Sequence, residues 1–354
     1  MSGNRQLPDQ SSGARRAIFW CVLVAVLASF CLAMLEFSAR AYKTLTYDGF
    51  LYLARSSPNS VAHPKYGWIS PPSTTQSKSD ECYGAGTVSY NAYGFRAPSL
   101  QKASTAEPLI CILGDSTMQA YQIPDGNSLP HLLQASLSKR HPNAVVLPLA
   151  VGGYGTLQEA MVFEDFCEPL KPDLIIWHWA SNDPVNNSYL AERTNVSNNN
   201  VRRRPYLENG QVVYRRPYPI HVSDSIDQLL LLRLANTLAL KLQASPLPEA
   251  VASYEKDGWD VADGLIAAVA RAIAVPKIAL IEDGQTKAAR MFRRHGFSVA
   301  THEKMPDEFT CKPRDSHPNA DGHRLMLSAL LPLLEEALER TGSVVRRQAP
   351  PAAQ

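Results

Sequence analysis

The chain has 354 residues, of which 45% are hydrophobic, a composition typical of proteins that bury a substantial core. Its 35 basic and 33 acidic residues give a formal net charge of +2, and no basic face interleaved with aromatic residues is visible in the sequence. These properties exclude a disordered chain and argue against nucleic acid as a partner.

The first expected element is an uncharged apolar segment from Ala17 to Leu35. As a helix, a segment of this length just spans the hydrocarbon core of a bilayer, which is about 30 Å thick. More arginine than aspartate precedes the segment, which predicts a cytoplasmic N-terminus and an exported remainder. We therefore expect residues 1–16 as a cytoplasmic tail and residues 17–35 as a single-pass anchor in the inner (cytoplasmic) membrane, with the main domain periplasmic or extracellular.

Two alternatives exist for this apolar segment. Ala39-Arg40-Ala41 has the small-x-small form of a cleavage site, so the segment could be a removed signal peptide. Its apolar run is longer than the ~7 to 15 residues usual for signal peptides, which favours the anchor. A buried core helix is the second alternative, and it is disfavoured because the segment is apolar on every face.

The segment from 36 to 107 lacks sustained periodicity and is rich in Ser, Pro, Gly and Tyr, which predicts a stem that packs on the main domain. From Pro108 onward, short apolar runs alternate with amphipathic ones, a pattern typical of a parallel sheet with crossover helices. The expected strands are Leu109–Leu113, Ala144–Leu149, Leu174–Trp179, Lys277–Ile281 and Phe297–Thr301. The expected helices are Ser128–Lys139, Leu157–Phe166, Val261–Val275, Thr286–His295 and Asp321–Arg340.

The alternation of strands and helices stops between residues 184 and about 262, which indicates an insertion with its own Leu-rich helix at Ile226–Leu242. This insertion follows the C-terminal end of a strand, where open α/β sheets place their ligand-binding loops. Residues 108–340 would then form the main domain, and residues 341–354 a disordered tail.

The six cysteines predict at most one disulfide and no metal site. Cys21 and Cys31 lie in the apolar segment, and Cys111 lies inside an expected strand as a small core residue. The other three fall in loops or at element ends, where an oxidising compartment could join two of them, and the pairing stays open: Cys82, Cys167 and Cys311. No pair has metal-ligand spacing.

A serine directly follows the first expected strand. Leu109 to Leu113 runs into Gly114-Asp115-Ser116-Thr117, so Ser116 would lie where a buried strand ends and a helix begins. Free N–H groups and the positive end of the helix dipole suit an anion that develops on a bound ester. Taken alone, however, this tripeptide favours an ordinary N-cap serine.

The next two expected strands also end in groups that can contact a ligand. Residues 150–156 form a glycine-rich turn around Gly153, and Ser181-Asn182-Asp183 follows the third strand. In isolation, the glycines would serve tight packing and Asn182 would stabilise a turn. Together, three consecutive strand ends would supply a hydroxyl, a backbone amide and a side-chain amide, which favours a catalytic site.

A histidine block precedes the last expected helix, in the sequence Asp315-Ser316-His317-Pro318-Asn319. The proline places His317 in a loop and His323 on the helix. An imidazole can accept the serine proton and return it to the leaving group, while a carboxylate holds the imidazole in the useful tautomer. The alternatives are a solvated loop histidine and a turn-forming aspartate.

These four blocks in this order resemble the SGNH hydrolase (GDSL-like) family, which is named for its serine, glycine, asparagine and histidine blocks. The resemblance covers residues 108–340 and extends upstream, where residues 91–96 resemble the Asn-x-x-Gly-Phe-Arg element of bacterial envelope members. Two departures are visible: the family often has Gly in place of Ala180, and often two residues between its Asp and His where this chain has Ser316 alone. The shorter spacing changes the face to which each side chain points, so the role of Asp315 depends on local geometry.

The resemblance implies a doubly wound, flavodoxin-like α/β/α sandwich with a five-stranded parallel sheet, preceded by one N-terminal transmembrane helix. It further implies Ser116 as nucleophile, His317 as general base and then acid, and Asp315 as the residue that orients His317. The Ser116 and Gly153 amides and the Asn182 side chain would form the oxyanion hole, in which the loss of one donor typically costs about 10² to 10³ in rate.

Further candidates lie near these blocks. His178 and Asp183 flank the end of the third strand and are candidate substrate contacts, although the position of His178 between two tryptophans is typical of a packed sheet residue. His323 is a fallback base if His317 proves dispensable. No cofactor is predicted, because Gly152-Gly153-Tyr154-Gly155 lacks the six-residue glycine spacing of a dinucleotide loop.

The leading hypothesis is a serine esterase that removes O-acyl groups, above all acetyl, from an exported or cell-envelope carbohydrate, as a partner of envelope polysaccharide machinery. The resemblance and the apolar segment together suggest this substrate class. The first alternative is an O-acyltransferase that uses the same acyl-enzyme, and the second is a non-catalytic carbohydrate-binding module. A flavodoxin-like electron carrier would share the sheet but would leave the block from Asp315 to His317 unexplained.

Overall fold

The computed structural model describes residues 10–45, 60–78, 86–194, 203–216, 248–312 and 315–348, together with isolated residues between 229 and 242. The chain divides into two compact units, one of Met1–Ser56 with Pro219–Leu242 and the other of Ser57–Tyr218 with Gln243–Gln354. Most of the predicted helix at Ile226–Leu242 lies outside the described residues.

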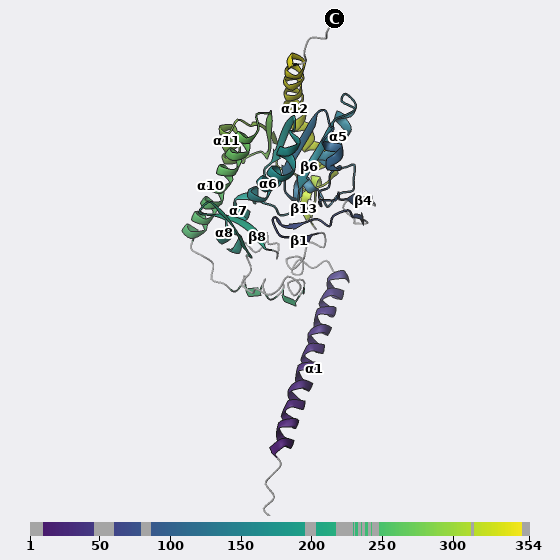
Figure 1. Cartoon of the computed structure of the whole chain (residues 1–354), viewed down its shortest axis with the longest axis vertical. Helices are drawn as coiled ribbons and strands as arrows, with labels where there is room; N and C mark the ends of the chain where they lie inside the picture. Colours follow the sequence, from purple (N-terminus) through teal and green to yellow (C-terminus); the bar gives the residue numbers. More distant parts are fainter. Residues whose placement is uncertain are drawn as a thin grey trace, which may run out of the picture. The chain divides into compact units, whose positions relative to one another are not determined.

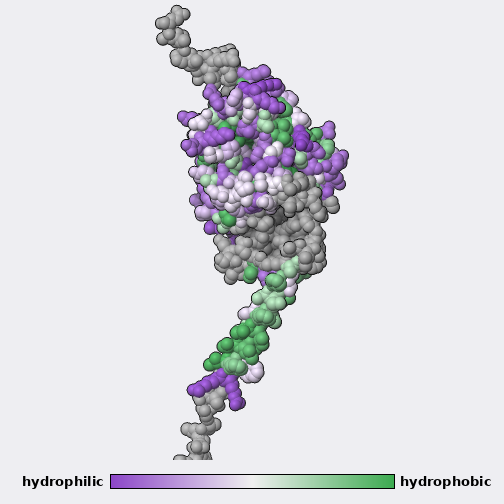
Figure 2. Space-filling view, turned by 90° about the vertical axis from the view of Figure 1, so that its right-hand side faces the viewer, coloured by the Kyte–Doolittle hydropathy of each residue, from purple (hydrophilic) through white to green (hydrophobic). Residues whose placement is uncertain are grey.

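The first unit contains the long helix α1 (Gln10–Leu45), in which the stretch Arg15–Ala39 has a mean hydropathy of 2.7. None of its most apolar window is buried, contrary to the alternative of a core helix. Hydrophobic residues cover the middle of α1 on the face seen in Figure 2, and hydrophilic ones gather toward its N-terminal end. The helix is long and apolar enough to cross a membrane, a property that an anchor and a signal peptide share.

The second unit is built on a parallel sheet, and the five predicted strands are confirmed to within one residue at each end. They are β5 (Leu109–Gly114), β6 (Val145–Ala150), β7 (Leu174–His178), β10 (Lys277–Glu282) and β11 (Ser298–His302). The strand order is β11-β10-β7-β5-β6, and every pair is parallel. This is the flavodoxin-like order, in which ligands bind outside the carboxyl ends of the strands where the winding reverses, here between β5 and β7.

Helices cover both faces of the sheet, which confirms the predicted α/β/α sandwich (Figure 1). Alternate residues of a strand point to opposite faces, so Cys111 and Leu113 of β5 join one apolar cluster while Ile110 and Ile112 join the other. The first cluster includes α6 (Thr156–Val162), α10 (Pro248–Ala272) and α11 (Thr286–Arg294), and the second includes α5 (Leu129–Leu137) and α12 (Ala320–Gln348).

Two helices are longer than predicted. The helix α10 begins at Pro248 rather than Val261, since proline is tolerated in the first helical turn, where its missing N–H has no intrahelical partner. The helix α12 continues to Gln348, because a glycine such as Gly342 costs only about 1 kcal/mol inside a helix and need not end it. Residues 341–348 are therefore helical rather than a disordered tail, and residues 349–354 lie outside the described part.

Short antiparallel pairs surround the sheet. They are β1 (Val61–His63) with β2 (Gly67–Ile69), β3 (Thr75–Lys78) with β4 (Gly86–Ser89), β8 (Arg204–Glu208) with β9 (Gln211–Arg215), and β12 (Thr310–Cys311) with β13 (Asp315–Pro318). The stem helix α3 is Leu100–Ala103. Trp68 and Phe95 of the stem are buried in the apolar cluster of the sheet.

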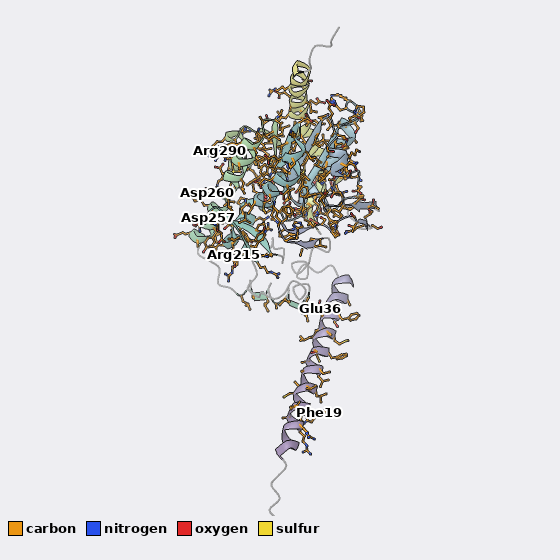
Figure 3. The ribbon with its side chains drawn as sticks, in the orientation of Figure 1. Phe19, Glu36, Arg215, Asp257, Asp260 and Arg290 are labelled. Carbon is orange, nitrogen blue, oxygen red and sulfur yellow. The ribbon has the colours of Figure 1, made fainter. Side chains whose placement is uncertain are left out.

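Three elements follow β7 within the expected insertion: α7 (Asp183–Asn187), α8 (Tyr189–Thr194) and the β8–β9 hairpin. The hairpin turns at Asn209 and Gly210, both with positive φ, which is the two-residue turn that suits the twist of its strands. On this hairpin, the exposed Arg215 (Figure 3) pairs with Glu208 at 2.7 Å.

The cysteines correct one expectation. Cys311 is disulfide-bonded, whereas Cys167 is a free, fully buried thiol and is therefore wrong as a disulfide candidate. Cys167 packs in the same apolar cluster as Cys111, which is also free and buried as predicted, and burial raises the pKa of the Cys167 thiol well above its usual range. Cys82 lies outside the described residues.

Candidate active site

Ser116 is the first residue of the short helix α4 (Ser116–Gln119), which begins directly after β5. The N-cap of this helix is Asp115, whose carboxylate accepts a hydrogen bond from the Thr117 N–H at 3.1 Å. The interpretation of Ser116 as an ordinary N-cap is therefore wrong. Its hydroxyl Oγ instead lies 2.7 Å from Nε2 of His317 and 3.3 Å from Oδ2 of Asp115.

The predicted histidine block places His317 on strand β13 rather than in an irregular loop. Residues two apart on a strand point to the same side, so the carboxylate of Asp315 bonds Nδ1 of His317 and also accepts the His317 backbone N–H at 2.9 Å. Gln122 donates to the other Asp315 oxygen at 3.2 Å. A spacing of one residue between aspartate and histidine is thus compatible with their contact.

The charges of this pair stabilise each other. Burial works against the ionisation of Asp315, but the hydrogen bond and charge of His317 outweigh it and lower the pKa of Asp315 to about 2. Burial likewise works to lower the pKa of His317, but Asp315 raises it above its usual value. An ionised carboxylate, an imidazole and a hydroxyl in this sequence form the arrangement that activates a serine for nucleophilic attack.

The glycine-rich turn after β6 lies against Ser116. A Cβ atom added to Gly152 would lie 3.7 Å from the Ser116 Cβ and only 2.9 Å from Oε1 of Gln119. Oε1 of Gln119 accepts the Gly152 N–H at 2.9 Å, and Nε2 of Gln119 donates to Ser70 at 2.7 Å. The next residue, Gly153, has a φ of 78°, a left-handed conformation that favours glycine.

Asn182 occupies the N-cap position of α7 without capping it. Its side-chain amide instead points toward the Ser116 site and donates to Oδ2 of Asp115 at 3.4 Å. The ends of β5, β6 and β7, three adjacent strands, thus bring Ser116, Gly152-Gly153 and Asn182 together, and β13 adds His317.

His178 and Asp183 are buried rather than open to a substrate, with 5% and 0% of their surface exposed. Oδ2 of Asp183 accepts the Ala180 N–H at 3.1 Å, and burial raises the pKa of this carboxyl well above its usual range. Nδ1 of His178 lies 4.0 Å from Asp115, and burial lowers the pKa of the ring to about 4. Both side chains are packed inside the protein at the end of β7. A substrate contact by either of them stays a prediction.

His323 lies inside the protein on α12 with 1% of its surface exposed. Its Nδ1 accepts the Leu129 N–H at 3.2 Å, and burial lowers the pKa of the ring to about 3. Its position is therefore that of a buried hydrogen-bond acceptor with a structural role, and not that of the fallback base.

The upstream element at residues 91–96 contacts the C-terminal end of α4, the helix that carries Ser116. The Asn91 side chain accepts the N–H groups of Tyr93 and Phe95 and so fixes the turn. Arg96 then bonds the Ala120 carbonyl and lies 3.3 Å from the Gln119 carbonyl, both at the C-terminal end of α4. The resemblance of this element to envelope proteins was the only signal in the sequence that could point to Arg96.

Three further side chains support the turn and were not identified from the sequence: Gln119, Trp68 and Arg204. Trp68 donates to the Gly152 carbonyl at 3.0 Å and Arg204 to the Gly153 carbonyl at 2.7 Å. Across the described ranges, no group of three His, Cys, Asp or Glu side chains is placed to hold a metal ion.

The comparisons with known proteins come from sequence and from structure. Residues 112–325 match the family model of the GDSL-like Lipase/Acylhydrolase family. No match was found among curated proteins.

Several solved structures are similar in fold. LAE5, an alpha/beta hydrolase enzyme from the metagenome of Lake Arreo in Spain, is 18% identical with a TM-score of 0.37, over 65% of this chain and 95% of that one. A two-domain esterase active on acetylated mannans is 14% identical with a TM-score of 0.39, over 72% of this chain and 54% of that one. The psychrotrophic esterase EstA from Pseudoalteromonas sp. is 11% identical with a TM-score of 0.34, over 66% of this chain and all of its own.

Proposed function

Because the chain belongs to the GDSL-like lipase/acylhydrolase family and is a carboxylic ester hydrolase, we propose that Ser116, His317 and Asp315 perform its reaction. The observation that supports these roles is the 2.7 Å contact between Ser116 Oγ and His317 Nε2, with Asp315 bonded to the opposite ring nitrogen. A serine hydroxyl needs an adjacent base to attack an ester at neutral pH, and the chain provides one.

In the first half of the reaction, Ser116 Oγ attacks the acyl carbon as its proton passes to Nε2 of His317. Asp315 stabilises the imidazolium that forms. When the tetrahedral intermediate collapses, the ester C–O bond breaks and the alcohol leaves with the proton from His317, which gives an acyl-enzyme on Ser116. Water then attacks the acyl carbon, with His317 again as base and then acid, and the carboxylic acid is released.

The negative charge of each tetrahedral intermediate needs hydrogen-bond donors. We assign this role to the backbone amides of Ser116 and Gly153 and to the side-chain amide of Asn182. The Asn182 amide has two N–H groups, so one can donate to Asp115 as observed while the other remains for the oxyanion. Each such donor typically contributes a factor of about 10² to 10³ in rate.

The proposed substrate is an O-acyl ester, with acetyl as the acyl group, on an exported or cell-envelope carbohydrate. Two features support an envelope setting: the apolar helix α1 and the Asn-x-x-Gly-Phe-Arg element that fixes Arg96 under α4. In this proposal α1 anchors the protein in the inner (cytoplasmic) membrane, with the active site in the periplasm or outside the cell. Its working partner would be envelope polysaccharide machinery.

The test of the proposed nucleophile is the detergent-solubilised full-length protein with p-nitrophenyl acetate and with a fluorophosphonate label. We expect Ser116→Ala to abolish turnover and labelling while it leaves the melting temperature near the wild-type value. The matched control is Ser328→Ala, which removes an exposed hydroxyl on α12 and should leave both unchanged. Wild-type turnover or labelling in Ser116→Ala would place the nucleophile elsewhere and would overturn the proposal.

Hydrolysis and transfer differ in what attacks the acyl-enzyme. With an acetylated oligosaccharide as donor and an unacetylated one as acceptor, a hydrolase releases acetate and a transferase acetylates the acceptor. Membrane location is tested separately by cell fractionation and by protease access in spheroplasts. Recovery of the full-length chain in the soluble cytoplasm would contradict the anchor.

A further inference from the structure

The two peptide groups of the glycine turn beside Ser116 are held by side chains from distant parts of the chain. The indole Nε1–H of Trp68, on strand β2 of the stem, donates to the Gly152 carbonyl at 3.0 Å. The Arg204 guanidinium, on strand β8 of the inserted hairpin, donates to the Gly153 carbonyl at 2.7 Å. Both carbonyls therefore point into the protein.

The planarity of the peptide bond means that the hydrogen bond from Trp68 also sets the direction of the Gly153 N–H. The carbonyl of Gly152 and the N–H of Gly153 belong to one planar trans peptide group, in which they point in opposite directions. The bond from Trp68 to the Gly152 carbonyl therefore turns the Gly153 N–H away from the indole. Within the part of the chain that the structure describes, no protein group accepts the Gly153 N–H. It is free to bind a substrate oxygen.

The side chains of Trp68 and Arg204 are also in contact with each other. The guanidinium carbon of Arg204 lies 4.7 Å from the centroid of the Trp68 ring, within the range of a cation–π contact. The strands approach so closely that a Cβ at Gly67 would lie 2.2 Å from the Arg203 carbonyl oxygen. Both Trp68 and Arg204 are only 1% exposed, so neither is available to touch a substrate.

The guanidinium of Arg204 is anchored on its other sides as well. It pairs with the buried carboxylate of Glu192 at 2.8 Å and donates to Oε1 of Gln158 at 2.6 Å. A planar guanidinium fork can serve three acceptors in fixed directions, which a flexible lysine cannot. The position of the Gly153 carbonyl is thereby tied to a rigid buried network.

We propose that Trp68 and Arg204 are positioning residues that orient the Gly152–Gly153 turn so that the Gly153 N–H stabilises the oxyanion. This inference rests on the proposed function, because it presupposes an oxyanion formed by attack of Ser116. Trp68 precedes the residues that match the family model, so in this protein the stem completes the site. The stem and the inserted hairpin act on the reaction through the turn, without contact with the substrate.

The decisive variant is Trp68→Phe, which keeps an aromatic ring and removes the N–H donor. The matched control is Trp179→Phe, because Trp179 is also buried but its Nε1 has no hydrogen-bond partner among the residues that the structure describes. We expect Trp68→Phe to lower kcat by about 10- to 10²-fold, less than complete removal of an oxyanion donor, with KM within about twofold of wild type. Trp179→Phe should lose a similar amount of thermal stability and keep its kcat within about threefold.

A second readout separates a misdirected donor from a smaller active fraction. Sulfur is a weak hydrogen-bond acceptor, so the hydrolysis of a thionoester depends less on oxyanion donors than that of the matching ester. The ratio of kcat for ester over thionoester should fall in Trp68→Phe and in Arg204→Lys, and should stay at the wild-type value in Trp179→Phe. A smaller active fraction would leave this ratio unchanged.

Several outcomes would overturn the positioning role. These are a wild-type kcat in Trp68→Phe, a raised KM at constant kcat, or an unchanged ester to thionoester ratio. If Trp68→Phe does not fold, benzothienylalanine at position 68 replaces the indole N–H by sulfur in an isosteric ring and gives the same test. Failure of the proposed function can be distinguished from failure of the positioning role. Retained turnover in Ser116→Ala would refute the proposed function. An inactive Ser116→Ala together with a fully active Trp68→Phe would refute the positioning role alone.

Discussion

The strand ends and the layer that supports them differ in how their polar groups are used. At the strand ends, Ser116 and His317 are partly buried, and Ser116 Oγ lies within hydrogen-bond distance of His317 and Asp115. In the supporting layer, which we define as Trp68, Arg96 and Arg204, each side chain is at most 4% exposed and bonds carbonyl oxygens near the site. The side chains at the strand ends should govern the reaction rate. The side chains of the supporting layer should govern stability and the direction in which the hydrogen-bond donors of the site point.

The largest effect should come from the base at the strand ends. We expect His317→Ala to lower kcat by at least about 10⁴-fold, comparable to Ser116→Ala, because residues that act as one unit have non-additive effects. The melting temperature should change by only a few degrees. The control is His141→Ala, which alters an exposed histidine after α5. A residual rate within tenfold of wild type would mean that another group accepts the serine proton.

Asn182→Ala sharpens the comparison, because this side chain belongs to the strand ends but takes no part in proton transfer. The loss of one oxyanion donor should lower kcat by about 10² to 10³ with little change in KM. Steady-state kinetics with an aryl acetate measures both constants, and Asn143→Ala, at an exposed loop position, is the control. A rise in KM at constant kcat would instead assign Asn182 to binding of the ground state.

Arg96→Met tests the supporting layer. The variant removes the guanidinium donor from two carbonyls at the end of α4, of which that of Ala120 also accepts the Ile123 N–H, and it breaks the 2.9 Å ion pair with Asp125. We expect the free energy of unfolding in urea to fall by about 2 to 4 kcal/mol, while kcat per folded molecule stays within about tenfold. Arg140→Met removes an exposed ion pair with Glu335 and should cost at most about 1 kcal/mol. Equal losses in both variants would contradict a special role for Arg96.

The smallest predicted effect is a shift in pH dependence. His317 must be neutral to act as a base, so kcat/KM should rise with pH through the pKa of His317, which Asp315 raises above 6.5. Asp315→Asn removes this influence and should move the rising limb to lower pH, although the charge of Asp115 remains and limits the shift. Asp315→Asn should also lower the maximal rate less than His317→Ala does.

The stability of the folded protein should change in the opposite sense. Because folding raises the pKa of His317, the charged pair with Asp315 stabilises the wild type below about pH 6.5. This contribution is lost as the pH rises through the raised pKa. Urea unfolding at mildly acidic and at basic pH checks that this contribution to stability decreases as the pH rises. For the rate, a pH profile of kcat/KM that does not shift in Asp315→Asn would remove Asp315 from the proposed catalytic set.

The sequence alone predicted the sheet and the residues that follow its strands. Each buried strand is a continuous apolar run, and Ser116, the glycine turn and Asn182 directly follow three such runs, so local periodicity locates them. Their convergence also follows, because parallel strands end at one edge of a sheet. Boundaries were less accurate where a residue tolerated inside a helix resembles a stop signal, as at Gly342 in α12.

The supporting layer and the burial of polar candidates were decided only by the tertiary structure. Trp68 and Arg204 reach the glycine turn from 84 and 51 residues away, and no local pattern encodes the direction of such a hydrogen bond. The burial of His178, Asp183 and His323 likewise follows from tertiary packing and not from the local sequence. Hydrophobic periodicity determines which strands form, whereas the orientation of a single peptide group depends on side chains that meet it only after the stem and hairpin have packed.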